Sequence, residues 1–526
     1  MSSMTRFGRW LRLCTGALAL GLAGPALAAE LYGPAPQNPT RGGTLNIGQL
    51  VEPPGLDPFH QAADARIRVS VLMYQGLFYE SPTGDAVPLL AEGYEVSPDG
   101  KTYTVRLRKG VKFHTGKDMT AADVAYSYDY IRDPANGSPG AGDFAMITAV
   151  EPVDDHTVRF VLNAPNASLP MTLGNKYGAV VPAGYFGDPN AKTQLNAKSV
   201  GTGPFKLGEF RPNSNLTLLR NENYWEKDAP YLDRINFLFM PNSAGLLVAL
   251  RNRRADLALL TRPQDVQQIT GVPGLVVERW PSLNQKAIDL GAEYGPLGDV
   301  RVRQAIALSV DKDEIMRASI GSYGQVIGTM LPAMQERWGV PLDQLANQKP
   351  DPAKAKQLLA EAGHADGLEL TLTTIAGYDW MDPAAVTLRE QLAGSGMRLN
   401  IQRVDLGVWI NNFRARKMGF TFNDWATQPD PNLLFYRHFH KPPEGADFRN
   451  WDNDEASRLL DAGRRESDPA KRKEIYQQFQ KLLAESVPTI MLFSADHITV
   501  RNDRVQNYTQ HPTGWYYGLA RTWLKK

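Results

Sequence analysis

The stretch LELTLTTIAGYDWMDPAAVTLREQLAGSGMRLNIQRV, residues 368–404, decides the fold because it joins two kinds of secondary-structure signal. Residues 368–375 and 397–404 alternate apolar and polar side chains and are rich in Thr, Ile and Leu, as strands are. The residues between them predict a helix over about 383–393. A strand–helix–strand unit of this kind places parallel strands in one sheet, so the sequence predicts an α/β fold.

Similar signals recur along the chain. GFTFND (419–424) predicts one more strand, and DRINFLFM (233–240) and ADLALL (255–260) predict two strands on either side of a helix through Leu246 and Leu250. Several helix ends carry capping residues. These are the capping box of Thr120 and Asp123, the acid–proline pairs at 351–352, 382–383 and 468–469, and Gly363 and Gly394.

Residues 80–198 differ from the rest of the chain. They are rich in Pro and Gly and contain short alternating runs such as TYTVRLRKG (102–110). The sequence therefore predicts two α/β lobes with a smaller mixed α/β insertion.

Composition is that of a soluble globular protein, with 43% hydrophobic and 21% charged residues among 526. The formal net charge is +1, and the first 28 residues contribute three arginines and no acid. Without them, 54 basic residues face 56 acidic ones, so no basic surplus argues for a nucleic-acid partner.

The N-terminus has the pattern of a cleavable export signal. Its arginines precede the apolar run LCTGALALGLAG (13–24), and Ala26-Leu27-Ala28 is a small-x-small cleavage pattern. We therefore expect residues 1–28 to be a signal peptide and the protein to reside in a bacterial periplasm. The single cysteine, Cys14, lies near the start of the apolar run, so we expect neither lipidation nor a disulfide.

Five blocks of the chain resemble, in order, the family 5 extracellular solute-binding proteins, the peptide, nickel and oligosaccharide receptors of ATP-driven importers. The blocks are GGTLNIGQLVEPPGLDP (42–58), LLAEGYEVSPDGKTYTVRLRKGVKFHTGKDMTAADVAYSYDYI (89–131), SVGTGPFKLGEF (199–210), NENYWEKDAPYLDRINF (221–237) and DVRVRQAIALSVDKDEI (299–315). They span nearly all of the chain after the signal peptide.

The resemblance implies a periplasmic-binding-protein fold with two lobes joined by a hinge. Domain I would comprise 29–79, 199–285 and 495–526, domain II would be the insertion 80–198, and domain III would be the second lobe, 286–494. It also implies that the protein, as a monomer without a cofactor, captures a solute between lobes I and III. An inner-membrane permease and its ATPase subunits would then receive the solute.

The resemblance also points to ligand residues on the loop after 419–424. In peptide-binding relatives this loop carries a tryptophan, an aspartate that holds the peptide ammonium group, and an acid–proline pair. Trp425 and Asp430-Pro431 match that pattern, and Gln428 stands where the aspartate would be. A neutral amide offers less to a cation than a carboxylate. Asp430 could instead only cap the helix that follows.

Dipeptide-binding relatives also have an arginine for the peptide carboxylate after the strand that matches 368–375. Residues 376–380, AGYDW, hold none. In a register one residue different, Asp379 or Asp430 would take the ammonium-binding role. We expect the aromatic residues nearby to offer a stacking surface, with core packing as the alternative. These are Tyr378, Trp380, Trp409 and Trp425.

The first prediction is a receptor for a peptide-like solute. Because both end anchors are missing, we expect a solute larger than a free dipeptide, or one with blocked ends or no peptide bonds, such as an opine or an oligosaccharide. A nickel complex is a further alternative within the family. His438 and His440 would point to one face if they lay on a strand, but they have no third ligand nearby in the sequence, so we predict no metal site. The chain after residue 28 has no cysteine, HExxH or GxSxG motif, so we predict no enzyme. A chaperone-like role is the alternative of another class.

Overall fold

The computed structural model describes residues 33, 35–61, 63–187, 196, 198–240, 242–442 and 449–526. The predicted signal peptide, with Cys14, lies outside the described residues. Within the described part, no helix is both long enough and apolar enough to cross a bilayer.

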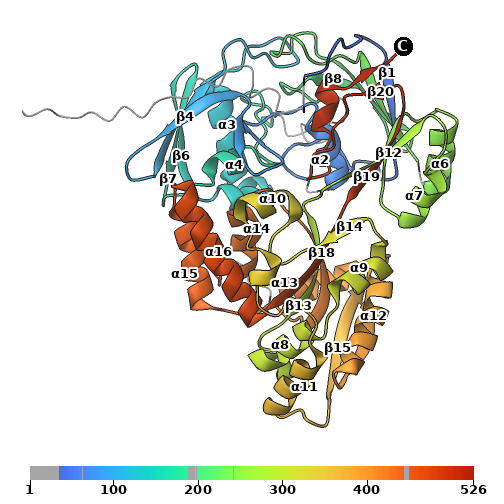
Figure 1. Ribbon diagram of the computed structural model, residues 1–526. Helices are drawn as coiled ribbons and strands as arrows, with labels where there is room; N and C mark the ends of the chain where they lie inside the picture. The colour runs from blue at the N-terminus through green and yellow to red at the C-terminus, as the bar shows by residue number, and fades with distance from the viewer. Residues whose placement is uncertain are drawn as a thin grey trace, which may run out of the picture.

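The first lobe is built on a seven-stranded sheet of order β12-β19-β11-β1-β10-β9-β8 (Figure 1). β1 pairs in parallel with β10 and β11, and the remaining pairs are antiparallel. Helices α6 and α7 cover one side of this sheet. The bounds are β1 (Thr44–Gln49), β8 (Phe205–Arg211), β9 (Asn215–Arg220), β10 (Arg234–Phe239), α6 (Ser243–Arg251), β11 (Leu257–Leu260), α7 (Pro263–Ile269), β12 (Leu275–Trp280) and β19 (His497–Asn502).

The second lobe is built on a six-stranded sheet of order β14-β18-β13-β17-β15-β16. Its strands are β13 (Asn284–Leu290), β14 (Gly324–Val326), β15 (Leu368–Ile375), β16 (Met397–Val404), β17 (Phe420–Ala426) and β18 (Thr489–Ala495). Its helices include α8 (Val300–Leu308), α9 (Lys312–Ile320), α11 (Pro352–Glu361), α12 (Met381–Gly394) and α13 (Leu406–Arg414). The chain passes between the two sheets twice, through residues 281–283 and through Asp496.

The strand–helix–strand prediction is confirmed, since β15 and β16 are parallel in the register Leu368 with Met397. Two details of the helix between them differ. α12 begins at Met381, two residues before Pro383, the predicted first helical residue, and Pro383 still fits because the first helical turn needs no N–H from it. The left-handed residue after the helix is Gly396 with φ 88°, whereas Gly394 is helical.

A four-stranded antiparallel sheet, β4-β5-β7-β6, forms the insertion together with α3 and α4. Their bounds are β4 (Ala91–Val96), β5 (Thr102–Leu107), α3 (Ala121–Arg132), β6 (Ile147–Asp154), β7 (Thr157–Leu162) and α4 (Leu169–Leu173). One hydrophobic cluster runs from Ile47 and Phe237 of the first lobe to Val105, Val124 and Phe160 of the insertion. The insertion and the first lobe therefore share an apolar core.

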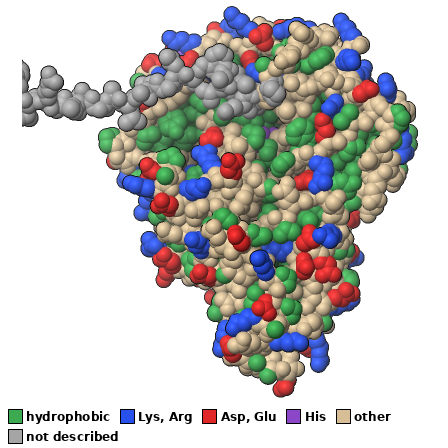
Figure 2. Space-filling model, viewed as in Figure 1, with side chains coloured by type: hydrophobic (Ala, Val, Ile, Leu, Met, Phe, Trp, Pro, Cys, Tyr) green, Lys and Arg blue, Asp and Glu red, His purple; other side chains and the backbone are tan. Residues whose placement is uncertain are grey.

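A helical subdomain of the second lobe lies directly below the insertion in Figure 1. It comprises α10 (Pro332–Trp338), α14 (Pro431–Phe439), α15 (Asp454–Arg465) and α16 (Pro469–Ser486). Its own hydrophobic cluster includes Leu434, Phe435, Leu460 and Phe479. Figure 2 shows basic and acidic side chains interspersed over the visible face, in keeping with the balanced composition.

Candidate functional site

Two adjoining cavities lie where the first lobe, the insertion and the second lobe meet. The first, of about 470 Å³, is walled by α2 (Asp64–Ser70), the β11–α7 connection, β13 and the loop from β15 into α12. The second, of about 440 Å³, lies between the insertion and the start of α14. Asp64, Ala426, Thr427 and Thr513 line both, so the end of β17 is the wall between them.

Tyr378 and Trp380 line the first cavity, as the expected stacking surface requires. Trp380 is only 7% exposed and also contacts Phe422 and Phe493, so it is both core and wall. Its Nε1 donates a 3.2 Å hydrogen bond to Oδ2 of Asp424. This bond fixes the indole plane at the cavity.

Trp409 and Trp425 have different positions. Trp409 is 8% exposed, stacks on Phe413 at 4.6 Å and donates from Nε1 to Oγ1 of Thr421 at 2.8 Å. It lines neither cavity, which corrects the expectation of ligand contact in favour of packing. Trp425 lies in β17, and its side chain is outside the described part of the chain.

Gln428 lines the second cavity, and its amide is already engaged. Nε2 donates a 2.5 Å hydrogen bond to Oε1 of Glu80 in the short strand β2 (Phe78–Glu80). Glu80 is fully buried, and burial raises the pKa of its carboxyl well above the usual range. A neutral amide suits this neighbour, whereas an aspartate at 428 would place a second carboxylate against it.

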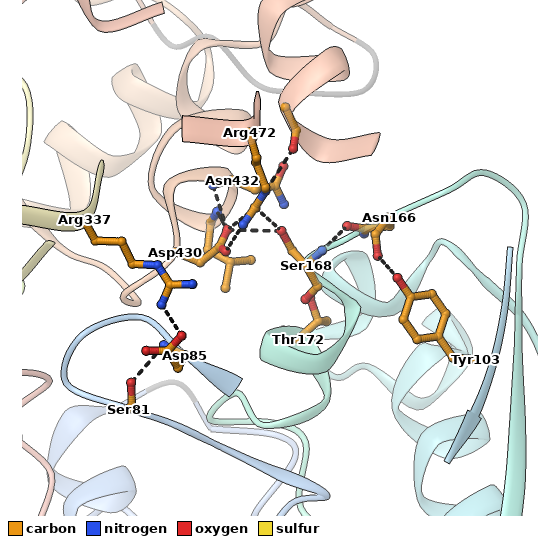
Figure 3. Close-up of polar contacts among 12 residues, drawn as sticks. Ser81, Asp85, Tyr103, Asn166, Ser168, Thr172, Arg337, Asp430, Asn432 and Arg472 are labelled. Atoms are coloured by element: carbon orange, nitrogen blue, oxygen red, sulfur yellow. Dashed lines mark hydrogen bonds and ion pairs between the residues drawn. The ribbon is translucent and has the colours of Figure 1, made fainter. Parts of the chain in front are cut away.

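Asp430 binds protein groups on all sides (Figure 3). Oδ1 accepts the backbone N–H of Asn432 at 2.8 Å, which caps α14, and the hydroxyl of Ser168 at 3.1 Å. Oδ2 accepts Nη1 of Arg472 at 3.0 Å. Asp430 is 1% exposed and lines neither cavity, so its expected ligand role gives way to the capping alternative.

His438 and His440 lie on and just after α14, not on a strand. Residues two apart on a helix do not share a face, so the projection that a strand would give is absent here. His440 stacks on Tyr436 at 4.5 Å, while His438 lines the second cavity. Burial lowers the pKa of His438 well below its usual value. In the described part of the chain, no cluster of three His, Cys, Asp or Glu side chains could hold a metal ion.

Ion pairs line the first cavity. Nζ of Lys286 lies 2.5 Å from Oδ2 of Asp424, and burial lowers the pKa of that ammonium group. Arg262 pairs with Asp265 at 2.9 Å. Several charged residues that line the two cavities carry no sequence signal for a site. These are Asp64 and Arg68 on α2, Lys176, Lys286, Arg437 and Arg464. The sequence shows the i, i+4 spacing of Asp64 and Arg68, but no local pattern shows that this face of α2 lines a cleft.

Two α/β lobes with cavities at their junction define a two-lobed solute-binding protein. The family model described as bacterial extracellular solute-binding proteins, family 5 Middle, matches residues 85–446. The chain belongs to this family of extracellular solute-binding proteins and has its periplasmic-binding-protein fold.

Relatives cover almost the whole chain. Di/tripeptide-binding protein 3 of Pseudomonas aeruginosa is 28% identical over 499 residues, 89% of this chain and 93% of that protein. The structure of a periplasmic binding protein from Helicobacter pylori in complex with the peptide STSA is 26% identical, has a TM-score of 0.77, and is covered to 99% by 93% of this chain. The binding protein AgaA in complex with agropinic acid, from A. tumefacien R10, has 25% identity and a TM-score of 0.77 over 92% of this chain and 99% of that one.

Proposed function

We propose that this protein is the periplasmic receptor of an ATP-driven importer, which captures a peptide-like solute between its lobes and delivers it to an inner-membrane permease with its ATPase subunits. The observation that carries the proposal is the pair of adjoining cavities, about 470 and 440 Å³, at the junction of the lobes. A cavity of a few hundred Å³ is the usual size for a small-molecule site. Peptide-binding relatives with matching length support the solute class.

The domain division supports capture by hinge closure. The hinge would consist of residues 281–283 and Asp496, where the chain passes between the two large sheets. The insertion would move with the first lobe, since apolar cores resist separation. Polar contacts join it to the second lobe, as in Gln428–Glu80 and Ser168–Asp430. Relative domain motion is the usual expectation unless an interface between domains is large and hydrophobic.

The engaged amide of Gln428 favours a second candidate within the same role. Because this amide is bonded to Glu80, it gives the site no negative group for a peptide's ammonium end. An opine, or a peptide with a blocked amino end, needs no such group. The similarity to the agropinic acid complex is in keeping with this candidate.

A thermal-shift panel tests the proposal. The purified protein, without residues 1–28, is heated with di- and tripeptides, N-acetylated peptides, agropinic acid, oligosaccharides and Ni²⁺. A ligand at about 100 times its Kd stabilises the folded state by about 2.7 kcal/mol, which raises the melting temperature by a measurable amount. We expect peptides or opines to do so.

Other outcomes would favour the alternatives. Stabilisation by Ni²⁺ alone, lost in His438→Ala, would indicate a metal receptor. Binding of unfolded proteins without any effect of small solutes would indicate a chaperone. Chemical conversion of a solute would contradict a pure binding role.

A further inference from the structure

Most charged side chains of the first cavity are paired within the protein. Lys286 pairs with Asp424, Arg262 with Asp265, and Asp496 with Arg279. Arg68 is different. It lines the cavity from α2, yet within the described part of the chain it forms no ion pair, and its buried Nε has no hydrogen-bond partner.

Among the described residues, no side chain around Arg68 lies within ion-pair distance of its guanidinium. Asp64 lies one turn earlier on α2 and lines the same cavity, but the two side chains are not within ion-pair distance. His497 lines the cavity as well, and burial together with the charge of Arg68 lowers the pKa of this imidazole to about 4. His497 is therefore neutral near pH 7 and does not compete with Arg68 for an anion.

No ion pair and no hydrogen bond from Nε, among the described residues, accounts for the position of this arginine. Its side chain is half-buried, and Gly514, with φ +84°, lies beside both Arg68 and His497; a Cβ there would come within 3.0 Å of the His497 ring and 3.8 Å of Nη2 of Arg68. A buried, unsatisfied N–H of a charged group is costly, and such groups in native proteins are commonly satisfied by a ligand, an ion or water. The opening beside it is the cavity.

We propose that Arg68 is the carboxylate anchor of this receptor, and that the captured solute carries a free carboxylate that lies in the first cavity against α2. This inference rests on the proposed function. A guanidinium presents a planar fork of donors that binds a carboxylate through two parallel hydrogen bonds. Arg68 would thus replace the arginine that residues 376–380 lack, from the first lobe instead of the second.

The test combines one side chain with one ligand group. Affinities of the wild type and of Arg68→Ala are measured by calorimetry for matched tripeptides with a free or an amidated carboxyl end, and for agropinic acid and its methyl ester. We expect the wild type to bind the free carboxylate roughly ten- to a hundredfold more tightly than the amide, the range of charge-assisted hydrogen bonds. In Arg68→Ala this ratio should fall to about one. Circular dichroism and the melting temperature check that the variant folds.

Two further variants sharpen the result. Arg68→Lys keeps the charge without the fork, so part of the ratio should remain. Arg262→Ala removes a cation of the same cavity that is already paired with Asp265, so the ratio should persist.

The outcomes separate the two proposals. Peptide binding with a ratio that Arg68→Ala leaves intact would overturn the anchor and leave the receptor standing. If Arg68→Ala abolished the preference for the free carboxylate with agropinic acid alone, the result would support the anchor and identify an opine as the solute that supplies the carboxylate. Binding of neutral solutes only, equally by wild type and Arg68→Ala, or no binding to any member of the panel, would overturn both.

Discussion

Oδ2 of Asp430 lies 3.0 Å from Nη1 of Arg472, with side-chain exposures of 2% and 9%, and Ser168 of the insertion joins this pair. The Ser168 hydroxyl donates to Oδ1 of Asp430 and accepts Nη2 of Arg472 at 2.7 Å (Figure 3). A buried ion pair within the second lobe is thus completed by a group from across the cleft. The acid–proline pair that marks α14 in the sequence serves this junction.

Asp430→Ala should lower the free energy of unfolding by about 3–5 kcal/mol, because it leaves the Arg472 guanidinium buried and uncompensated. The effect is measured from the first unfolding transition in thermal or urea denaturation. Asp85→Ala is the control, because it removes an ion pair between exposed side chains, Asp85 at 51% and Arg337 at 37%. It should lower the free energy of unfolding by less than about 1 kcal/mol. Equal effects of the two substitutions would contradict the burial argument.

Ser168→Ala should weaken solute binding by roughly three- to tenfold and speed its release, because one buried hydrogen bond across the cleft is lost, worth about 1 kcal/mol. Stopped-flow dissociation rates measure this. Ser309→Ala removes a buried serine hydroxyl bonded to Ala305 and Ser395 within the second lobe. It should lower stability without changing the release rate. A release rate unaffected by Ser168→Ala would show that this contact does not hold the closed state.

Gln428→Leu should destabilise the folded protein by about 1–3 kcal/mol, since it leaves the buried Glu80 carboxyl without its amide donor. Because this amide is not available as a cation anchor, N-acetylation of a bound peptide should change wild-type affinity by less than about threefold. Calorimetry with matched free and acetylated peptides checks the second statement. A large preference for the free ammonium group would show that another carboxylate, such as Asp379 or Asp64, holds it.

Trp380 should report solute binding, whereas Trp409 should not. The Trp380 ring lines the first cavity, so a bound solute changes its surroundings; Trp409 is packed on Phe413 away from both cavities. Trp380→Phe should therefore remove much of the ligand-induced change in tryptophan fluorescence, and Trp409→Phe should preserve it. The opposite pattern would move the binding surface away from the first cavity.

Lys312 predicts a pH dependence of stability. Burial lowers the pKa of its ammonium group to about 7, against about 10.4 in an unfolded chain. Between these values the unfolded chain binds the proton and the folded protein does not, so this group makes stability rise with pH from about 7 to 10. Unfolding measured from pH 6 to 9.5 should show this rise, and Lys312→Met should flatten it. A wild-type curve parallel to that of Lys312→Met would mean that the buried amine keeps its proton.

The order of secondary structure follows from local chemistry. Alternation along 368–375 and 397–404, with a helical period between them, suffices to define β15, α12 and β16. Acid–proline caps at 351–352 and 468–469 begin α11 and α16 because the N-cap acid satisfies backbone N–H groups within its own turn. Gly363 with φ +89° follows α11 for an equally local reason.

Charge pairing depends on contacts between residues far apart in the chain, and here only the tertiary structure decides. Asp430 and Gln428 lie two residues apart, yet one meets Arg472 and Ser168 while the other meets Glu80. Arg68 stands out only in the folded protein, where the other cations of the first cavity, Arg262 and Lys286, are paired and His497 is neutral. The sequence by itself determined which elements form, because hydrophobic period and capping are local, and its five matching blocks pointed to the family. Which charges remain free at the cavity was decided by the packing of the lobes, because each pairing joins distant segments.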